Sequence, residues 1–154
     1  MDKVLNFNIR ENLSSINEKY FMIYLICVLS IGYYGKFRCE NIKGHKDILE
    51  WNLFPNSGKY GLDGWSVSHF LFNMLVGYLY PDSLLVSTTL GGLWELFETY
   101  VGIYQPEIIK GFGFCPTDLN ENKVWWYGKF SDLVVNFAGF VTGVMIYNLV
   151  NKKM

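Results

Sequence analysis

Five polar side chains lie inside the longest apolar stretches of the chain, where ionisable groups are costly. They are His69, Glu95, Glu98, Asp132 and Asn136. A charged side chain at the centre of a bilayer costs roughly 2.5–3.5 kcal/mol on insertion scales, so such residues usually face a protein interior or a wet cavity. Because they occupy three neighbouring segments, we expect them to form one site.

The spacing of these residues places them on matching helix faces. Glu95 and Glu98 are three positions apart and Asp132 and Asn136 four apart, so each pair lies on one face of a helix. At about 1.5 Å of rise per residue, His69 and Asn136 lie roughly 8 Å from the starts of their helices, and Glu98 lies about 9 Å from the end of its helix. In the four-helix bundle predicted below, these helix ends lie on the same side of the membrane. We therefore expect all five groups to lie in one layer.

The residue types indicate the chemistry of this layer. Converging carboxylates repel one another unless they are protonated or bridged by a cation. Hard divalent cations, calcium and magnesium, prefer carboxylate and amide oxygens, which Glu95, Glu98, Asp132 and Asn136 offer. His69 is then available as a general base, because hard cations do not favour imidazole. At a membrane interface this combination suits metal-assisted chemistry on a lipid phosphate.

Each residue also has a purely structural interpretation. His69 and Asn136 can hydrogen-bond between helices, Glu95 and Glu98 can pair with basic side chains from a loop, and Asp132 can cap a helix. We favour a functional site because intramembrane carboxylates are rare.

Composition indicates the class of protein that carries the site. The chain has 154 residues, of which 51% are hydrophobic and 18% charged, with a mean hydropathy of +0.15. These values predict a single integral membrane domain over residues 1–154 rather than a soluble enzyme. The net charge of −1 gives no indication of nucleic-acid binding.

Four apolar segments approach the roughly 20 residues needed to cross a bilayer. They cover residues 20–34, 64–80, 82–104 and 131–150, with Pro81 ending the second and Asp82 as a candidate cap for the third. We therefore predict an all-α, multi-pass membrane protein, a bundle of four transmembrane helices with two longer loops on one side.

The basic residues and the cysteines give information on which side of the membrane the two longer loops lie. Eight Lys and Arg residues lie on the loop side and five on the side of the termini, so the positive-inside rule favours a cytoplasmic loop side by a small margin that leaves orientation open. Cys39 and Cys115 share the loop side and can pair if that side is oxidising. No CxxC or Cys/His spacing supports a zinc site. We favour the structural interpretation, in which the thiols are unpaired.

The order of these motifs resembles the core of the base-exchange phosphatidylserine synthases of eukaryotes, over about residues 64–143. The matching residues are Trp65 and His69, then Trp94, Glu95 and Glu98, then Trp125, Trp126, Asp132, Asn136 and Gly139. The chain departs from that family at Lys123, Val124 and Tyr127, where the family has acidic residues beside its Trp pair, and it is much shorter.

The resemblance implies a phosphatidyl transferase that exchanges choline or ethanolamine for L-serine on a phospholipid. His69 is then the base that activates the serine hydroxyl, and Glu95, Glu98 and Asp132 hold the divalent cation, with calcium favoured over magnesium. Four residues would bind substrate or support the site: Asn136, Trp94, Trp125 and Trp126. An endoplasmic-reticulum-type membrane is expected if the source is eukaryotic or viral.

A second interpretation keeps the same cavity without catalysis. The WE-x-x-E and Asp/Asn pattern is similar to that of small VanZ-like bacterial membrane proteins, whose size is closer to that of this chain. This interpretation predicts binding of a lipid or small amphiphile without turnover. A transporter or proton relay is a weaker third interpretation, because four spans without a visible inverted repeat make a poor pathway.

Overall fold

The structure, a computed structural model, describes residues 16–41, 47–54, 61–112, 115 and 127–151. The regular structure of these residues is helical, with one isolated β-bridge between Asn52 and Asp63. The four long helices are α2 (Glu18–Asn41), α3 (Gly64–Leu79), α4 (Leu84–Tyr104) and α6 (Phe130–Asn151), and the short 3-10 helices are η1 (Ile48–Glu50) and η2 (Glu107–Ile109). The predicted all-α fold is confirmed.

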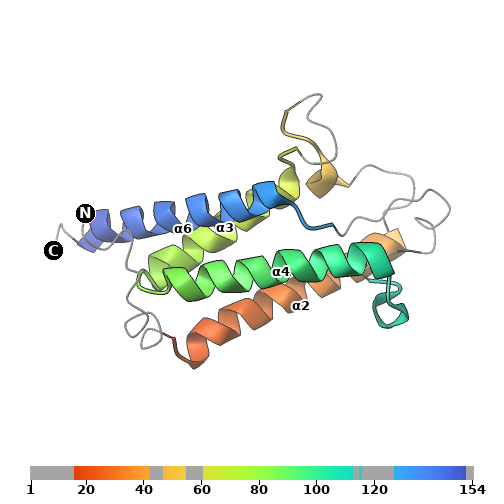
Figure 1. Ribbon diagram of the computed structural model, residues 1–154, viewed down its shortest axis with the longest axis horizontal. Coiled ribbons are helices and arrows are strands. Elements are labelled where there is room, and N and C mark those ends of the chain that lie inside the picture. Colours follow the sequence, from red (N-terminus) through yellow and green to blue (C-terminus); the bar gives the residue numbers. More distant parts are fainter. Residues whose placement is uncertain (1–15, 42–46, 55–60, 113–114, 116–126, 152–154) are drawn as a thin grey trace.

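The four long helices run side by side in an elongated bundle (Figure 1). The last turns of α2 and α4 and the first turns of α3 and α6 lie toward the same end of the bundle, on the right in Figure 1, near η1 and η2. We call this end the loop end. It is the end at which the sequence places the polar layer.

Two of the helices have the length and composition of membrane spans. These are α2, with 24 residues, and α6, with 22 residues. Helix α3 has 16 residues, fewer than the roughly 20 that a perpendicular span needs. Helix α4 has 21 residues but carries two glutamates. The four-span arrangement therefore stays a prediction for α3 and α4.

The helix boundaries differ from the predicted ones at two places. Helix α2 continues beyond residue 34 to Asn41, because its polar last turns are held by Arg38, whose side chain is buried in ion pairs. Helix α4 begins at Leu84 with Ser83 as its N-cap residue, so Asp82 is not the cap.

Local chemistry explains where α3 starts and stops. Asp63 accepts a hydrogen bond from the backbone N–H of Ser66 at 3.0 Å and forms a capping box with it. The helix ends at Leu79 with Tyr80 as its C-cap residue, before Pro81, whose ring cannot continue the helical hydrogen bonds. The capping box fixes the loop end of α3, from which His69 projects.

Glycines bring α3 and α6 into close backbone contact. A β-carbon added at Gly139 or Gly143 would collide with the carbonyl oxygen of Phe70 or Met74 on α3, and one added at Gly77 would collide with Phe140 on α6. Gly139 and Gly143 form a GxxxG motif on α6, and these contacts show that it serves packing inside the chain. The close approach places the polar faces of α3 and α6 against each other.

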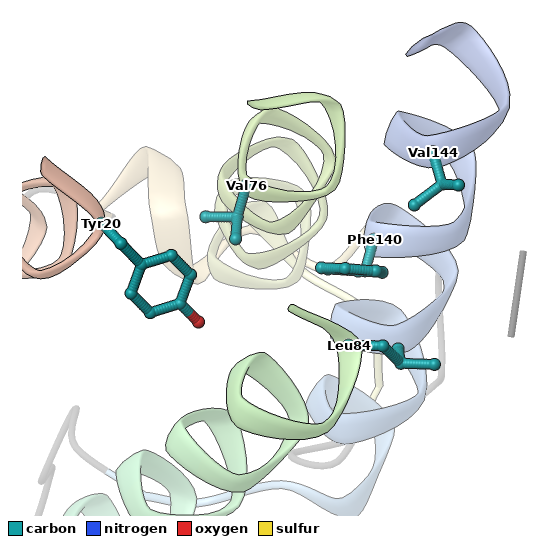
Figure 2. Close-up of a cluster of buried hydrophobic side chains, with 5 residues drawn as sticks. All are labelled: Tyr20, Val76, Leu84, Phe140 and Val144. Atoms are coloured by element: carbon teal, nitrogen blue, oxygen red, sulfur yellow. The ribbon is translucent and has the colours of Figure 1, made fainter. Parts of the chain in front are cut away.

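A cluster of apolar side chains closes the end of the bundle opposite the loop end. It contains Tyr20 of α2, Val76 of α3, Leu84 of α4, and Phe140 and Val144 of α6 (Figure 2). The Tyr20 hydroxyl lies 2.9 Å from the Ser87 hydroxyl on α4. This contact satisfies the polar tip of Tyr20 and fixes α2 against α4.

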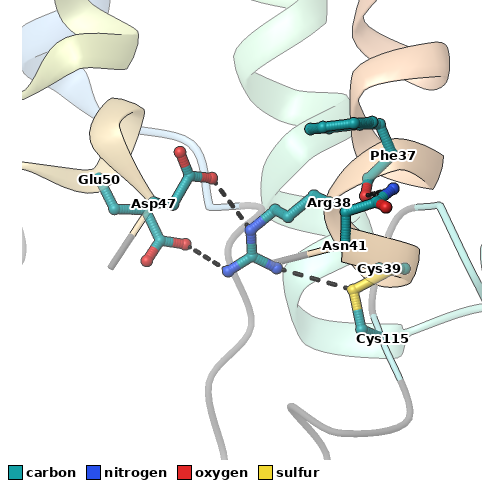
Figure 3. Close-up of a disulfide and its surroundings, with 7 residues drawn as sticks. All are labelled: Phe37, Arg38, Cys39, Asn41, Asp47, Glu50 and Cys115. Carbon is teal, nitrogen blue, oxygen red and sulfur yellow. Dashed lines mark hydrogen bonds and ion pairs between the residues drawn. A yellow bond between two sulfur atoms is a disulfide. The ribbon is translucent and has the colours of Figure 1, made fainter. Parts of the chain in front are cut away.

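A disulfide and a buried arginine fasten the loop end. Cys39 and Cys115 are bonded, with their Cα atoms 5.1 Å apart (Figure 3). The neighbouring Arg38 donates to Asp47 at 3.0 Å and to Glu50 at 2.8 Å, which ties η1 to α2. The prediction of unpaired thiols is therefore wrong. Sequence spacing does not reveal that the fold brings these two backbone positions together.

Candidate functional site

Three helices bring the predicted polar residues together toward the loop end. His69 comes from α3, Glu95 and Glu98 from α4, and Asp132 and Asn136 from α6. The Nδ1 atom of His69 lies 3.0 Å from Oδ1 of Asn136 and 3.8 Å from Oε1 of Glu95. The imidazole therefore lies between the amide of α6 and a carboxylate of α4.

His69, Glu95 and Glu98 are close enough to share one cation. Each offers a ligand atom, and these three atoms all lie within 4.8 Å of one another. Two carboxylates about 5 Å apart repel by roughly 3 kcal/mol at an effective dielectric constant of about 20. This repulsion exceeds the net stabilisation that one ordinary hydrogen bond gives. The pair of carboxylates therefore favours a bound cation or a shared proton.

Glu95 has one satisfied and one unsatisfied carboxylate oxygen. Its side chain is buried, with the residue 6% exposed. Oε2 accepts a hydrogen bond from the backbone N–H of Lys129 at 2.8 Å. Oε1 is buried and accepts no hydrogen bond from any residue that the structure describes. Leaving such an atom unsatisfied costs about 1–3 kcal/mol, which a cation at Oε1 would offset.

Glu98 is oriented by a neighbour on its own helix. The indole N–H of Trp94 donates to Oε1 of Glu98 at 2.8 Å, across one helical turn. Trp94, predicted as a substrate-binding or supporting residue, thus lies beside the acidic pair and holds one of its carboxylates. This bond orients the carboxylate that Glu98 offers to the three-residue cluster.

The hydrogen bonds around His69 determine which of its nitrogens carries the proton. Asn73 donates from Nδ2 to the backbone carbonyl oxygen of His69 at 3.0 Å, which identifies this atom as nitrogen. The same Nδ2 lies 2.6 Å from Oδ1 of Asn136, so the Asn136 atom must be the accepting oxygen. His69 Nδ1 faces that oxygen and therefore donates. In the neutral ring Nε2 then holds the free lone pair.

Asp132 is next to this group but outside the three-residue cluster. It is buried and accepts a hydrogen bond from the hydroxyl of Ser66 at 2.6 Å. It also lines the same small cavity as His69 and Glu98. The hydrogen bond from Ser66 links α6 to the first turn of α3 and occupies one carboxylate oxygen of Asp132. The side chain of Asp132 also borders the cavity.

The cavity is about 20 Å³ in volume, enough for about one water molecule or ion. Its walls are Trp65, His69, Glu98, Tyr127, Lys129 and Asp132. Among the residues that the structure describes, the carboxylates in and next to it (Asp63, Glu95, Glu98 and Asp132) outnumber the ammonium groups, of which Lys129 provides one. The site is therefore electronegative, which favours a cation.

Lys129 forms a buried ion pair with Asp63. The residue is 4% exposed, and its ammonium group also lies 5.0 Å from the centre of the Tyr127 ring. Burial opposes the charge, but the Asp63 hydrogen bond and the neighbouring negative charges outweigh it and raise the pKa of Lys129 above its usual value. Burial raises the pKa of the Tyr127 hydroxyl. Lys129 thus carries its charge throughout the physiological range.

Two of the predicted site residues lie outside the part of the chain that the structure describes. Two residues at the site were not predicted from the sequence. Trp125 and Trp126 fall in the segment 116–126, outside the described residues. Asn73, which orients Asn136 and contacts His69, was missed. Its signal was available, because an asparagine one turn after a histidine in an apolar helix is itself unusual. Lys129 was counted only as a loop charge.

Comparison of the chain with protein-family models, with curated proteins and with solved structures found no match in any of the three. The resemblance to phosphatidylserine synthases and the similarity to VanZ-like proteins therefore stay predictions from the residues named above.

Proposed function

We propose that the chain is a membrane-embedded enzyme of phospholipid headgroup metabolism that works with a divalent cation. The observation that carries this proposal is the cluster of His69, Glu95 and Glu98, whose ligand atoms lie within 4.8 Å of one another. The buried Oε1 of Glu95, which accepts no hydrogen bond from the described residues, supports it independently.

Helices α2 and α6 support the membrane placement. Both have the length and composition of spans, and α3 packs closely along α6 through its glycines. In the proposed arrangement α3 and α4 complete a four-span bundle, with α3 short enough that its ends lie in the interfacial region. The site near the loop end then lies just beneath the lipid headgroups, where a phosphodiester can reach it.

Glu95 and Glu98 are the proposed ligands of the cation, with Asp132 completing the oxygen set from α6. Calcium is favoured over magnesium, because separate helices form an irregular site that the flexible coordination of calcium tolerates better. The cation would neutralise charge on the phosphate oxygens. Trp94 holds Glu98 in place, and Lys129 holds Glu95 through its backbone N–H.

His69 is the proposed general base. With its Nδ1–H donated to Asn136, Nε2 has the lone pair needed to take the proton of the serine hydroxyl. The serine oxygen then forms a bond to phosphorus while the bond from phosphorus to the choline or ethanolamine oxygen breaks. The same imidazole returns the proton to the departing alcohol, so the exchange is balanced in atoms and charge.

The direct experiment is serine incorporation by the purified protein in mixed micelles. Phosphatidylcholine or phosphatidylethanolamine is supplied with isotopically labelled serine and calcium, and labelled phosphatidylserine and released alcohol are both measured. We expect equal amounts of the two products, loss of both in His69→Ala and Glu95→Gln, and unchanged turnover in Glu107→Gln, a carboxylate exposed on η2. Turnover that survives both site substitutions would refute the assignment.

The second candidate is lipid binding without catalysis, as in the VanZ-like interpretation. The small volume of the inner cavity disfavours catalysis on a headgroup inside it, because about 20 Å³ admits an ion or a water molecule but no headgroup. In this candidate the lipid binds outside that cavity. This candidate predicts that phospholipid stays bound through purification and that no alcohol is released under any cation.

A further inference from the structure

A groove runs between α4 and the start of α6 on the outer surface of the bundle. It is an open groove of about 500 Å³, lined by Thr89, Gly92, Leu93, Glu95, Leu96, Thr99, Gly128, Lys129, Phe130 and Leu133. Three of its apolar side chains are strongly exposed: Leu93 at 56%, Leu96 at 67% and Phe130 at 80%. The groove is thus mainly apolar and open to the surroundings of the bundle.

The groove adjoins the polar site at Glu95 and Lys129. Glu95 lines the groove, and its Oε1 lies 3.8 Å from His69 Nδ1. Lys129 lines both the groove and the inner cavity. An occupant of the groove therefore meets apolar side chains along most of its length and the edge of the acidic cluster where it reaches Glu95.

We propose that the groove holds an acyl chain of a phospholipid taken from the surrounding bilayer, with the phosphate end of that lipid beside Glu95. The position of the headgroup rests on the proposed function. The position of the acyl chain is argued from the groove alone.

The size of the groove favours a lipid chain over a helix of a second copy. A helix about 10 Å across fills roughly 400 Å³ per turn of 5.4 Å, so the groove accommodates little more than one turn. The volume falls within the roughly 300–1,000 Å³ of small-molecule sites. Because α6 has the composition of a membrane span, its exposed face meets lipid chains first.

A glycine in the groove provides the test variant. Gly92 lines the groove, and a β-carbon added there meets nothing within 4 Å, so we expect a larger side chain to enter the groove and the fold to tolerate it. Gly32 on α2 is equally open and does not line the groove. Gly92→Leu therefore fills the groove, and Gly32→Leu is its matched control.

The experiment uses vesicles of phosphatidylcholine that carries a photoreactive diazirine in one acyl chain. After irradiation, labelled residues are located by peptide mass spectrometry. We expect labelling to concentrate on Leu93, Leu96, Phe130 and Leu133, to fall at least fivefold in Gly92→Leu and to be unchanged in Gly32→Leu. The proposal would be overturned if labelling were spread evenly over all exposed apolar side chains. It would also be overturned if Gly92→Leu left the labelling unchanged.

Two further outcomes separate this proposal from the proposed function. Glu98 does not line the groove, so Glu98→Gln should retain groove labelling while it loses the cation. Groove labelling in a wild-type protein that binds no cation would refute the proposed function and leave the groove assignment standing. Protein-to-protein cross-links through the groove in place of lipid adducts would assign it to a second copy and refute the lipid assignment.

Discussion

His69 Nδ1 and Asn136 Oδ1 lie 3.0 Å apart, although 67 residues separate them in the chain. The amide oxygen of Asn136 is itself oriented by Asn73, at 2.6 Å. Two asparagines from α3 and α6 thus direct the proton of His69 to Nδ1 and leave Nε2 as the basic atom. Second-sphere hydrogen bonds of this kind commonly fix the tautomer of functional histidines.

The first prediction concerns this tautomer. In protein labelled with ¹⁵N-histidine, with His45→Gln to leave one histidine, the spectrum at alkaline pH should show a protonated Nδ1. Asn136→Leu removes the acceptor and should shift the ring toward the Nε2–H form. Asn151→Leu, an exposed substitution on the same helix, should leave the spectrum unchanged. An Nε2–H tautomer in the wild type would contradict the arrangement.

The second prediction concerns the buried pair of Lys129 and Asp63. Removing one partner leaves a buried unpaired charge, so Lys129→Met should lower the free energy of unfolding by roughly 3–5 kcal/mol. The double variant Asp63→Asn/Lys129→Met should recover part of this loss, because Asn still caps α3. Lys110→Met, which breaks only an exposed pair with Glu107, should cost less than about 1 kcal/mol.

The same pair predicts a dependence of stability on pH. The pKa of Lys129 is raised in the folded state, so its contribution is complete below the ordinary lysine pKa of about 10.4 and is lost as pH rises through the higher folded value. Thermal unfolding followed from about pH 8 to 12 should show an alkaline loss of stability that is smaller in Lys129→Met. Equal losses in the two proteins would show that Lys129 does not cause the effect.

The third prediction concerns the disulfide. Cys39 and Cys115 are 76 residues apart, and closing a loop of that size removes denatured-state entropy worth about 4 kcal/mol in the chain-entropy model. Reduction, or the variant Cys39→Ser, should therefore lower the melting temperature clearly. Cys27→Ser, at the free cysteine of α2, is the control and should respond to reductant as the wild type does.

The fourth prediction concerns orientation. Disulfides persist on the oxidising side of a membrane, so we expect the loop end to face away from the cytosol, against the small basic excess of the loops. In a Cys27→Ser background, Glu107→Cys on η2 should react with a membrane-impermeant maleimide added to intact cells. Reaction only after the membrane is opened would place the loop end in the cytosol.

Sequence patterns identified the helices and the polar layer because both follow from local periodicity. The positions of Pro81 and the apolar segments give the four helices to within a few residues at most ends. The i,i+3 spacing of Glu95 and Glu98 gives a shared helix face, and the structure places both near His69. These features depend on residues within one or two turns.

The remaining features depend on which helices pack together. The bonds from Asn73 to Asn136 and from Lys129 to Asp63 join residues more than 60 positions apart, and no local pattern specifies them. The disulfide is of the same kind, since its formation depends on Cys115 meeting the last turn of α2, which carries Cys39, at the loop end. Long-range pairing is a property of the packed fold.

The fifth prediction is the most direct test of the central claim, that the acidic pair of α4 binds a divalent cation. Terbium, a luminescent substitute for calcium, is titrated into the purified protein in micelles and excited through tryptophan, since Trp94 contacts Glu98. We predict one site per chain, displaced by calcium, abolished in Glu95→Gln/Glu98→Gln and retained in Glu107→Gln. Equal terbium binding and equal calcium displacement in the wild type and the double variant would contradict the account.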